Sequence, residues 1–239
     1  EDLKGALEST SREAASYFGD GTVLIERYVQ NPRHIEVQIL ADQHGNVVHL
    51  FERECSIQRR FQKVIEEAPS PSLTPELRKE MGNMAVFLAQ EMSYTNAGTI
   101  EFLVDEDLNY YFLEMNTRIQ VEHPVTEMIT GIDLVEEQLA IASGRKLKLR
   151  QEDIHMKGHA IEARIYAEDP ENEFIPSPGE ISFYKAPKLF DGRFRLDSAI
   201  VGPCTIHPDY DPMIAKLVVW DENRDLAIEG LHHALHNYE

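Results

Sequence analysis

The sequence predicts an α+β protein whose sheet is mostly antiparallel, and three observations lead to this fold class. Residues 34–40 alternate strictly between apolar and polar side chains, which is typical of a strand. Residues 46–52 form a second such run after the turn-like segment ADQHG, so the two runs predict a hairpin. Thr74 followed by Pro75 is typical of the first turn of a helix. Paired strands with helices between them indicate α+β rather than all-α or all-β architecture.

Further runs of β-branched and aromatic residues predict six more strands. They span residues 22–29, 98–104, 109–116, 158–167, 180–185 and 213–220. Helices are predicted over residues 9–18, from Thr74, from about residue 132 to 144, and from about residue 223. The helix that begins at Thr74 carries an apolar stripe that we interpret as core-facing, composed of Leu77, Met81, Met84, Leu88 and Met92.

Composition limits the classes of function. The chain has 239 residues, of which 42% are hydrophobic, enough for one large or two modest domains with a core. Its formal net charge of −19 is a poor electrostatic match for nucleic acid and for anionic membranes, so we expect neither as a partner. Only two cysteines occur, without the spacing of a zinc site, which favours a cytoplasmic location. No apolar run approaches the roughly 20 residues of a membrane span.

The most informative stretch is Glu101 together with EMNTRIQVEHPVTE at residues 114–127. In an extended segment, five of its polar residues share one parity and project to one side: Glu114, Asn116, Arg118, Gln120 and Glu122. Carboxylate and amide oxygens are the hard ligands that Mg²⁺ prefers, and Mg²⁺ completes its shell with water and substrate phosphates. Glu101, Glu114 and Asn116 therefore indicate a nucleotide site with a metal. A solvated hairpin with scattered charge is the alternative that spacing alone leaves open.

This metal site depends on the register of the two predicted strands. Glu101 and Glu114 face each other only if paired positions have numbers that add to 215. A slip of one residue would place the two carboxylates on opposite faces of the sheet. We predict the register in which they share a face.

A second polar cluster, ECSIQRRFQKVIEEAP at residues 54–69, is rich in cations although the chain is acidic. With the preceding residue, its cations are Arg53, Arg59, Arg60 and Lys63. Such cations can hold an anion like phosphate or bicarbonate. The alternative is ion pairing with the nearby carboxylates, which are Glu52, Glu54, Glu66 and Glu67.

These two clusters resemble the signatures of biotin carboxylases, which are ATP-grasp enzymes. The resemblance continues, in the same order, through HIEVQIL (34–40), GHAIEARIYAED (158–169), FIPSPG (174–179) and YDPMIAKL (210–217). The paired carboxylates and Asn116 occur across ATP-grasp ligases, whereas the run from Arg118 through Thr126 points to biotin carboxylases in particular. The resemblance covers nearly the whole chain. It implies an ATP-grasp fold with a mostly antiparallel sheet and a biotin carboxylase C-terminal subdomain.

The resemblance also implies a reaction. Members of the family use ATP to activate bicarbonate as carboxyphosphate, and then transfer the carboxyl group to N1′ of biotin on a carrier protein. This implies ATP, Mg²⁺ or Mn²⁺, and biotin as cofactors. It implies a biotin carboxyl carrier protein or domain and a carboxyltransferase as partners, and a homodimer formed through the C-terminal part. The final acyl-CoA or pyruvate acceptor is chosen by the carboxyltransferase.

The resemblance further implies roles for individual residues. We expect Glu101, Glu114 and Asn116 to hold the metal, and Glu122 to be the base that deprotonates bicarbonate. We expect Arg164 to stabilise the biotin enolate, since fixed positive charge is needed where negative charge develops. The bicarbonate site is expected to contain Lys63, Arg118, Gln120 and Val121, of which Lys63 and Arg118 also join the catalytic set. The expected contacts to ATP are Glu26, Arg27, Val29, His34, Gln58, Glu101, Leu103 and Glu114.

The chain departs from the family pattern in two residues and in extent. Phe61 stands where many members have a polar residue that touches the nucleotide, and Arg27 stands where they often have Lys. We expect residues 1–27 to be a remnant of the ATP-grasp lid, 28–150 the catalytic core, and 151–239 a truncated C-terminal domain. The first residue is not Met, and the Gly-rich phosphate loop is not in this sequence. We therefore expect a fragment with little or no ATPase activity of its own, because phosphoryl transfer depends on positioning.

Two other interpretations stay open. Another ATP-grasp ligase, such as a carbamoyl-phosphate synthetase-like enzyme, would share the metal ligands but is expected to lack the biotin-facing Arg164. A non-catalytic role in folding, dimerisation or carrier binding is also compatible with descent from an enzyme.

Overall fold

The structure is a computed structural model that describes residues 2–187 and 192–239. The chain divides into two compact units, Glu1–Gln30 and Asn31–Glu239. All strands of the described chain belong to the second unit, which also contains the residues predicted to bind metal and bicarbonate. Among the described residues, no helix combines the length and the apolar character that crossing a membrane requires.

The first unit consists of helix α1 (Leu3–Phe18) and an extended tail. The Asp2 side chain caps the start of the helix by accepting from the Lys4 N–H, and Gly19 ends it in a left-handed conformation. The predicted strand 22–29 is wrong, because this segment forms no β-ladder in the described chain. Its β-branched residues favour extended backbone, but a strand also needs hydrogen-bond partners on a neighbouring strand, and the described part of this unit offers none.

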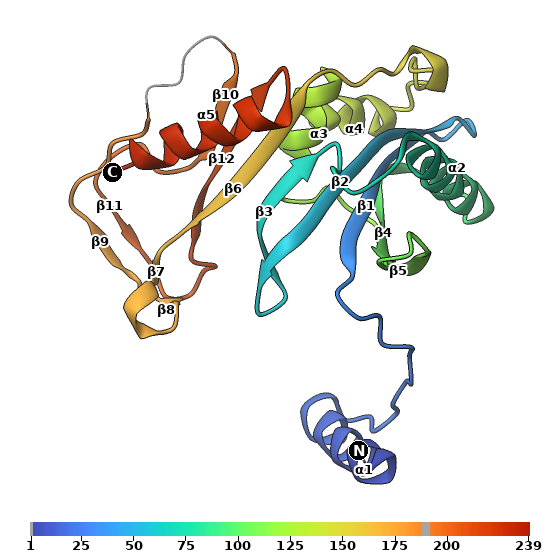
Figure 1. Cartoon of the computed structure of the whole chain (residues 1–239), viewed down its shortest axis with the longest axis horizontal. Coiled ribbons are helices and arrows are strands. Elements are labelled where there is room, and N and C mark those ends of the chain that lie inside the picture. Colours follow the sequence, from blue (N-terminus) through green and yellow to red (C-terminus); the bar gives the residue numbers. More distant parts are fainter. Residues whose placement is uncertain (1, 188–191) are drawn as a thin grey trace. The chain divides into compact units, whose positions relative to one another are not determined.

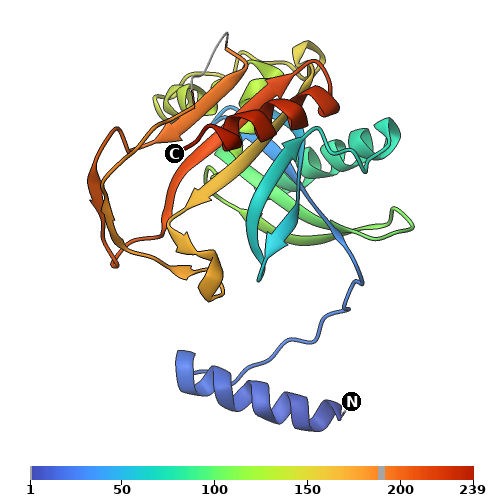
Figure 2. The ribbon, with the colours of Figure 1, turned by 60° about the vertical axis from the view of Figure 1, so that its left-hand side comes forward.

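The second unit is built on an eight-stranded antiparallel sheet, which Figures 1 and 2 show from two sides. Across the sheet the strands follow the order β10-β12-β6-β3-β2-β1-β4-β5. They are β1 (Arg33–Ala41), β2 (Val47–Arg59), β3 (Gln62–Ala68), β4 (Asn96–Val104), β5 (Tyr110–Asn116), β6 (His159–Tyr166), β10 (Phe194–Ser198) and β12 (Met213–Asp221). Two small sheets pair β7 (Glu168–Asp169) with β8 (Ile175–Pro176), and β9 (Gly179–Ile181) with β11 (Cys204–Ile206). The predicted fold class is confirmed.

Most predicted strands are also confirmed. The predicted hairpin is β1 and β2, although β2 continues to Arg59. The predictions at 98–104, 109–116, 158–167 and 213–220 correspond to β4, β5, β6 and β12. The prediction at 180–185 is mostly wrong, because β9 ends at Ile181, which pairs with Cys204, the first residue of its three-residue partner β11. β3 and β10 were not predicted. The sequence of β3 mixes charged and apolar residues without one clear period, whereas β10 alternates between apolar and charged residues but is only five residues long.

Helices cover both faces of the large sheet. Helices α2 (Pro75–Glu91) and α5 (Arg224–His236) pack on one face, called here the α2/α5 face. Helices α3 (His123–Thr130) and α4 (Leu134–Ala142) pack on the opposite face, called here the α3/α4 face. Single 3₁₀ turns lie at Gln151–Asp153 and Pro170–Asn172. Because the sheet is covered on both sides, polar side chains of the strands are buried as well as apolar ones.

Helix α2 begins where it was predicted, since the Thr74 hydroxyl accepts from the Leu77 N–H at 3.2 Å. Its apolar stripe is only partly as predicted: Met81 is fully buried, whereas Met84 and Met92 are exposed. The helix instead turns small residues toward the sheet. A Cβ on Gly82 would lie 2.6 Å from Nε2 of His49, so the approach is too close for a larger residue.

Helix α3 was not predicted. The extended interpretation of residues 114–127 is wrong beyond Asn116, where β5 ends and the chain bends before α3. Pro124 lies in the first turn of the helix, and Gly131 ends it with a φ of 70°. The shared parity of the polar residues therefore does not hold along the whole stretch, and the bend decides where the later ones lie.

Candidate active site

Four charged residues form a cross-strand row on the α3/α4 face of the sheet. From β5 to β2, the directly paired positions are Glu114, Glu101, Glu36 and Arg53. Glu101 pairs with Glu114, so the predicted register is confirmed and the two carboxylates share one face. Like charges directly opposite each other destabilise a sheet, so this row needs positive charge close by.

Lys63 on β3 supplies one of the positive charges. Its Nζ lies 2.5 Å from Oε2 of Glu36, 3.1 Å from Oε1 of Glu101 and 2.6 Å from Oε1 of Glu122. Burial lowers the pKa of Lys63, but the surrounding carboxylates outweigh burial and raise its pKa above the usual value. Lys63 is therefore a fixed positive charge at the point where three carboxylates converge.

Arg53 on β2 supplies a second positive charge and is fully buried. Its guanidinium donates five hydrogen bonds of 2.5–3.2 Å to Glu36, Gln38, Thr99, Gln120 and Thr126. These five bonds use all five donors of an arginine. The sequence suggested Arg53 as a cation that could hold a substrate anion, and this is wrong, because the guanidinium has no donor left for one.

The other cations of the basic cluster pair with distant carboxylates. Arg59 lies 2.5 Å from Glu168, and Arg60 lies 3.0 Å from Glu173. Ion pairing, which the sequence left open as the alternative to anion binding, is confirmed for these two cations. Their partners, however, are not the nearby carboxylates that were expected. The nearby carboxylates instead bind arginines of other elements: Glu52 with Arg78, Glu54 with Arg33, Glu66 with Arg164, and Glu67 with Arg224.

The three residues expected to hold a metal lie together. Nδ2 of Asn116 donates to Oε1 of Glu101 at 3.0 Å and to Oε1 of Glu114 at 2.9 Å. Burial raises the pKa of Glu101, but His34, whose Nε2 lies 2.6 Å from Oε2, and Lys63 lower it to about 2. Glu101 is thus ionised at neutral pH. Two carboxylates and one amide give a set of oxygen donors, which fits Mg²⁺ or Mn²⁺.

Glu122 is buried between two cations at the residue before α3. Its Oε1 faces Lys63, and its Oε2 accepts from Nη2 of Arg164 at 3.1 Å. Nε of Arg164 donates at 2.6 Å to Glu66. Burial lowers the pKa of Arg164, while Glu66 and Glu122 together raise it further above its usual value. A carboxylate that could act as a base therefore lies beside a guanidinium whose orientation is fixed.

The other residues expected at the bicarbonate site lie in the bend between β5 and α3. Gln120 is buried and bonded within the charged row. The carbonyl oxygen of Val121 accepts from Lys216 at 2.8 Å. Arg118 is exposed, and its Nη2 donates to Oδ1 of Asn116 at 3.0 Å. The bend thus places an exposed guanidinium next to the metal candidates.

Comparison with known families identifies this arrangement. The family model described as carbamoyl-phosphate synthase L chain, ATP binding domain, matches residues 1–150. The model described as biotin carboxylase C-terminal domain matches residues 162–239. The chain belongs to the biotin carboxylase family. Its fold is accordingly the ATP-grasp fold of this family, and the resemblance stated from the sequence is confirmed.

Individual relatives agree with this assignment. The chain is 57% identical over 238 residues to biotin carboxylase 2 of Bacillus subtilis, covering 100% of the chain and 53% of that relative. It is 55% identical to biotin carboxylase of Halalkalibacterium halodurans, covering 100% of the chain and 52% of that relative. The biotin carboxylase domain dimer of Hydrogenobacter thermophilus 2-oxoglutarate carboxylase, solved with MgADP, ADP and bicarbonate, matches with a TM-score of 0.93 and 51% identity. That match covers 99% of this chain and 52% of the other, so the chain spans about half the length of these relatives.

The residues expected at the nucleotide of a biotin carboxylase belong to both units. Glu26, Arg27 and Val29 lie in the first unit. In the second unit, Leu103 on β4 is the direct cross-strand partner of His34 on β1. The structure therefore brings His34 and Leu103 together on the α3/α4 face, next to the charged row.

The turn between β2 and β3 carries the position where this chain departs from the biotin carboxylase pattern. Arg60 and Phe61 both have positive φ, as in the two-residue turns that favour hairpins. The Phe61 side chain is 97% exposed at this tip. Gln58, expected near the ribose, lies on β2 before the turn, and its Nε2 donates to the Cys55 carbonyl at 2.8 Å.

Glu36 is a member of the charged row that the sequence did not single out. It is fully buried, and although burial raises its pKa, Arg53 and Lys63 lower the pKa below the usual value. With His34 and Glu101 it also forms a group whose ligand atoms all lie within 4.8 Å of one another. The available signal was its place in the strictly alternating strand, on the same side as His34 and Gln38.

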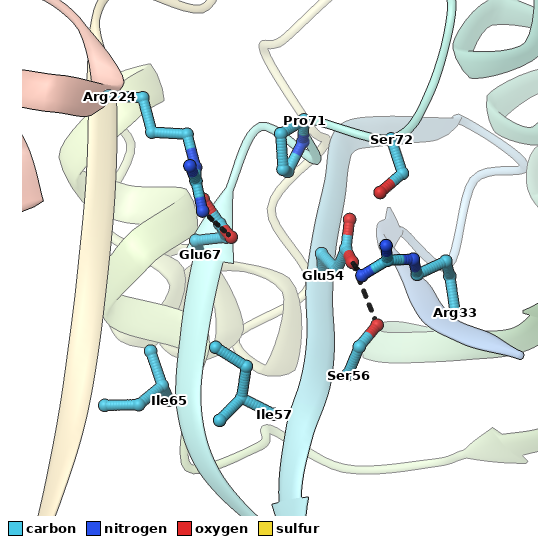
Figure 3. A pocket seen from close by; sticks show the side chains of 9 residues that line it. All are labelled: Arg33, Glu54, Ser56, Ile57, Ile65, Glu67, Pro71, Ser72 and Arg224. Atoms are coloured by element: carbon cyan, nitrogen blue, oxygen red, sulfur yellow. Dashed lines mark hydrogen bonds and ion pairs between the residues drawn. The ribbon is translucent and has the colours of Figure 1, made fainter. Parts of the chain in front are cut away.

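A separate pocket of about 340 Å³ lies on the α2/α5 face, between the loop before α2 and the start of α5 (Figure 3). Two ion pairs line its rim, Arg33 with Glu54 at 3.4 Å and Arg224 with Glu67 at 2.6 Å. Ile57 on β2 and Ile65 on β3 are apolar residues that line the pocket, as Figure 3 shows. The pocket is on the opposite face from the charged row, so it is distinct from the candidate active site.

Proposed function

We propose that the natural protein containing this chain catalyses the ATP-dependent carboxylation of carrier-bound biotin with bicarbonate, through carboxyphosphate. This is the first half-reaction of a biotin-dependent carboxylase. The observation that supports it best is the buried Glu122 held between Lys63 and Arg164, at 2.6 and 3.1 Å. The same substrates are supported by the MgADP and bicarbonate bound to the Hydrogenobacter thermophilus relative.

In this proposal Glu122 removes the proton of bicarbonate. A general base must lie within hydrogen-bond reach of the proton that it accepts. Lys63 contacts Glu122, and the bend that leads to α3 carries Arg118, Gln120 and Val121. In the proposal these groups hold bicarbonate next to Glu122. Their positive charge and donors favour the negative charge that develops on bicarbonate as its oxygen attacks phosphorus.

Arg164 acts in the second step, when the phosphate released from carboxyphosphate takes the N1′ proton of biotin, negative charge moves to the ureido oxygen, and N1′ accepts the carboxyl group. Its guanidinium is oriented by Glu66 on one side and Glu122 on the other. A charge that is already oriented stabilises the enolate without further reorganisation. Arg164 lies on β6, so the biotin and bicarbonate sites meet where β3 and β6 pair.

Glu101, Glu114 and Asn116 would hold Mg²⁺ or Mn²⁺, which would offset the charge of the ATP phosphates when bound. The apolar side chain of Leu103 and the adjacent His34 would contact the nucleoside. The other proposed contacts to ATP are Glu26, Arg27, Val29 and Gln58.

The proposal includes an organisation and partners. Residues 1–27 would belong to the lid, 28–150 to the catalytic core and 151–239 to the C-terminal domain, which agrees broadly with the matched ranges 1–150 and 162–239. A biotin carrier and a carboxyltransferase would be the partners, since some relatives are named as subunits of carboxylases. A homodimer is supported by the dimeric neighbour. A cytoplasmic location is supported by Cys55 and Cys204, which form no disulfide in the described chain.

A second candidate is a different ATP-grasp ligase, because the family model that matches residues 1–150 is named after the ATP-binding domain of carbamoyl-phosphate synthase. The metal ligands alone do not separate the two functions. Arg164 favours biotin as the acceptor, since it lies in the part of the chain that matches the biotin carboxylase C-terminal domain.

The test is a steady-state assay of the natural full-length protein with MgATP, bicarbonate and free biotin. We expect ADP release that depends on both bicarbonate and biotin, and carboxybiotin as a product. Glu122→Gln should lower this rate by about 10³-fold or more while changing nucleotide affinity by less than about threefold, because the base touches bicarbonate rather than ATP. Glu136→Gln, an exposed carboxylate on α4, is the matched control and should keep the rate.

Two results would contradict the proposal. ADP release that depends on bicarbonate and ammonia or another amine, but not on biotin, would support the second candidate. Equal losses of nucleotide affinity and rate in Glu122→Gln would show that this carboxylate is not the base.

A further inference from the structure

Two buried carboxyl groups that the proposed reaction does not use lie next to Arg164. Glu66 on β3 and Glu162 on β6 are direct cross-strand partners, and both are fully buried. Directly opposite residues of antiparallel strands have Cβ atoms about 4.5–5.5 Å apart, so the two carboxyl groups are neighbours on the α3/α4 face. We refer to them as the carboxyl pair.

The carboxyl pair is only partly satisfied by hydrogen bonds. Oε1 of Glu66 accepts from Nε of Arg164 at 2.6 Å. The other oxygen of Glu66 and both oxygens of Glu162 have no hydrogen-bond partner in residues 2–187 and 192–239. A buried carboxylate without a partner is among the most costly groups in a protein, and it normally takes up a proton instead.

The charges around the carboxyl pair decide which member holds the proton. The titratable groups that face it are Arg164 and Tyr166 on β6, Lys216 on β12, Cys55 on β2, Glu36 on β1 and Glu122 before α3. The Lys216 ammonium is engaged with the Val121 carbonyl and with Asp197. Arg164 therefore remains as the cation bonded to the pair, and it is bonded through Glu66 alone. Negative charge is stabilised on Glu66, and a proton is favoured on Glu162.

We infer that the carboxyl pair carries one proton, located on Glu162, and that the ionised Glu66 fixes the Arg164 guanidinium against Glu122. Both residues are then positioning residues that act through Arg164. This inference rests on the proposed function, in which Arg164 stabilises the biotin enolate.

The positioning has a pH dependence with a definite sign. Burial raises the pKa of Glu66 to about 7 despite the opposing effect of Arg164, and burial raises the pKa of Glu162 well above its usual value. As the pH falls below 7, a second proton neutralises Glu66 and removes the anion that orients Nε of Arg164. Activity that needs an oriented Arg164 should therefore fall on the acid side.

The test measures kcat and KM for free biotin from pH 6 to 8.5 in the natural full-length protein and its Glu162→Gln variant. Gln is neutral, as a protonated Glu162 is, so this variant leaves the charge next to Glu66 unchanged. We expect the acid limb of kcat to keep its position within about 0.3 pH unit and kcat at pH 8 to stay within about threefold of the parent value. An ionised Glu162 would instead oppose the ionisation of Glu66, and its replacement would move the acid limb down by about one pH unit. Glu152→Gln, at an exposed carboxylate, is the matched control and should leave the profile in place.

Glu66→Gln is the complementary variant, because it resembles a protonated Glu66 at every pH. We expect kcat for biotin carboxylation to fall by about tenfold or more at pH 8, the acid limb to flatten, and KM for ATP to change less than about twofold. A downward shift of about one pH unit in the acid limb of Glu162→Gln, or full kcat in Glu66→Gln, would overturn the inference.

A second readout separates this inference from the proposed function. Denaturant midpoints of the parent and Glu162→Gln are compared from pH 5 to 7.5, where no substrate is involved. We expect the midpoint of the variant, relative to the parent, to rise with pH, because the folded parent keeps a proton on Glu162 that its unfolded chain releases, whereas the amide has no such proton to lose. A difference between the two midpoints that stays constant from pH 5 to 7.5 would show that Glu162 does not hold the proton in the folded protein, and would overturn the inference. A parent protein without biotin-dependent activity, but with this pH dependence, would instead contradict the proposed function alone.

Discussion

On the α2/α5 face of the sheet, β1 presents Ile35, Val37 and Ile39 to helix α2, whereas on the α3/α4 face the same strand presents Glu36 and Gln38 to a network of charges. All five side chains are buried. Burial alone therefore does not distinguish the two faces. The difference is in what each side chain needs from its neighbours.

Apolar contacts on the α2/α5 face have no direction, so the core there depends on volume and close packing. Each polar group on the α3/α4 face must meet a specific partner, because a buried donor, acceptor or charge left alone is costly. The first kind of face stabilises the fold. The second holds charged groups at defined distances, which is what a reaction site requires, and the cost of burying these charges offsets much of their mutual attraction.

Arg53→Met in the natural full-length protein should have the largest effect and tests the α3/α4 face. Removal of the guanidinium leaves Glu36 without one of its two cations and four other side chains without a donor. We expect a loss of about 3–5 kcal/mol in the free energy of unfolding, measured by chemical denaturation. Arg150→Met removes an exposed ion pair and should cost less than about 1 kcal/mol. Similar costs for the two variants would show that the buried network does not behave as a unit.

Met81→Ala tests the α2/α5 face. Met81 is fully buried in the core under α2, so truncation leaves a cavity and should cost about 2–5 kcal/mol in the same denaturation measurement. Because the face carries no site residue, we expect kcat and nucleotide affinity to stay within about twofold. Met84→Ala, on the exposed side of the same helix, should cost less than about 1 kcal/mol. A large loss of activity in folded Met81→Ala would mean that the two faces are coupled.

The two faces should also respond to acid with opposite signs. Burial lowers the pKa of His49, on the α2/α5 face, from 6.5 to about 4. Between these values the unfolded chain takes up a proton that the folded chain does not, so the free energy of unfolding falls as the pH falls. Glu66, on the α3/α4 face, has its pKa raised from 4.5 to about 7. There the folded chain keeps a proton that the unfolded chain releases, so the free energy of unfolding rises as the pH falls from 7 to 4.5.

His49→Gln separates the two contributions by removing the titration on the α2/α5 face. Relative to the parent, we expect this variant to gain about 2 kcal/mol in the free energy of unfolding between pH 7 and pH 5. Denaturation midpoints at pH 7, 6 and 5 measure the gain. If the free energies of unfolding of variant and parent differ by the same amount at pH 7, 6 and 5, the lowered pKa of His49 in the folded protein is contradicted.

Local patterns predicted the elements that have a local cause. The β1–β2 hairpin follows from alternation, and the start of α2 follows from Thr74 and Pro75. The segment 22–29 has strand-like composition but no strand partner in the described chain, and α3 was hidden within a polar stretch that also fitted an extended segment. In both cases the outcome depends on residues distant in the sequence, which a local pattern does not contain.

The candidate site was predictable to a similar degree. The register that pairs Glu101 on β4 with Glu114 on β5 was predicted, and residues 114–127 resemble the signature of the family to which the chain belongs. The partners of the cations did not follow. Arg53 was one of four equivalent cations in the sequence, yet it is the one whose donors are all used within the protein.

The sequence by itself determined the fold class, the alternation of the strands and the chemical kinds of group at the site, because these depend on residue type and short-range spacing. Only the tertiary structure decided which charge meets which. Lys63 is 59 residues from Glu122, and Arg164 is 98 residues from Glu66, yet each pair is within hydrogen-bond distance. The sheet brings β3 next to both β2 and β6, and this long-range pairing turns separate charged residues into one network.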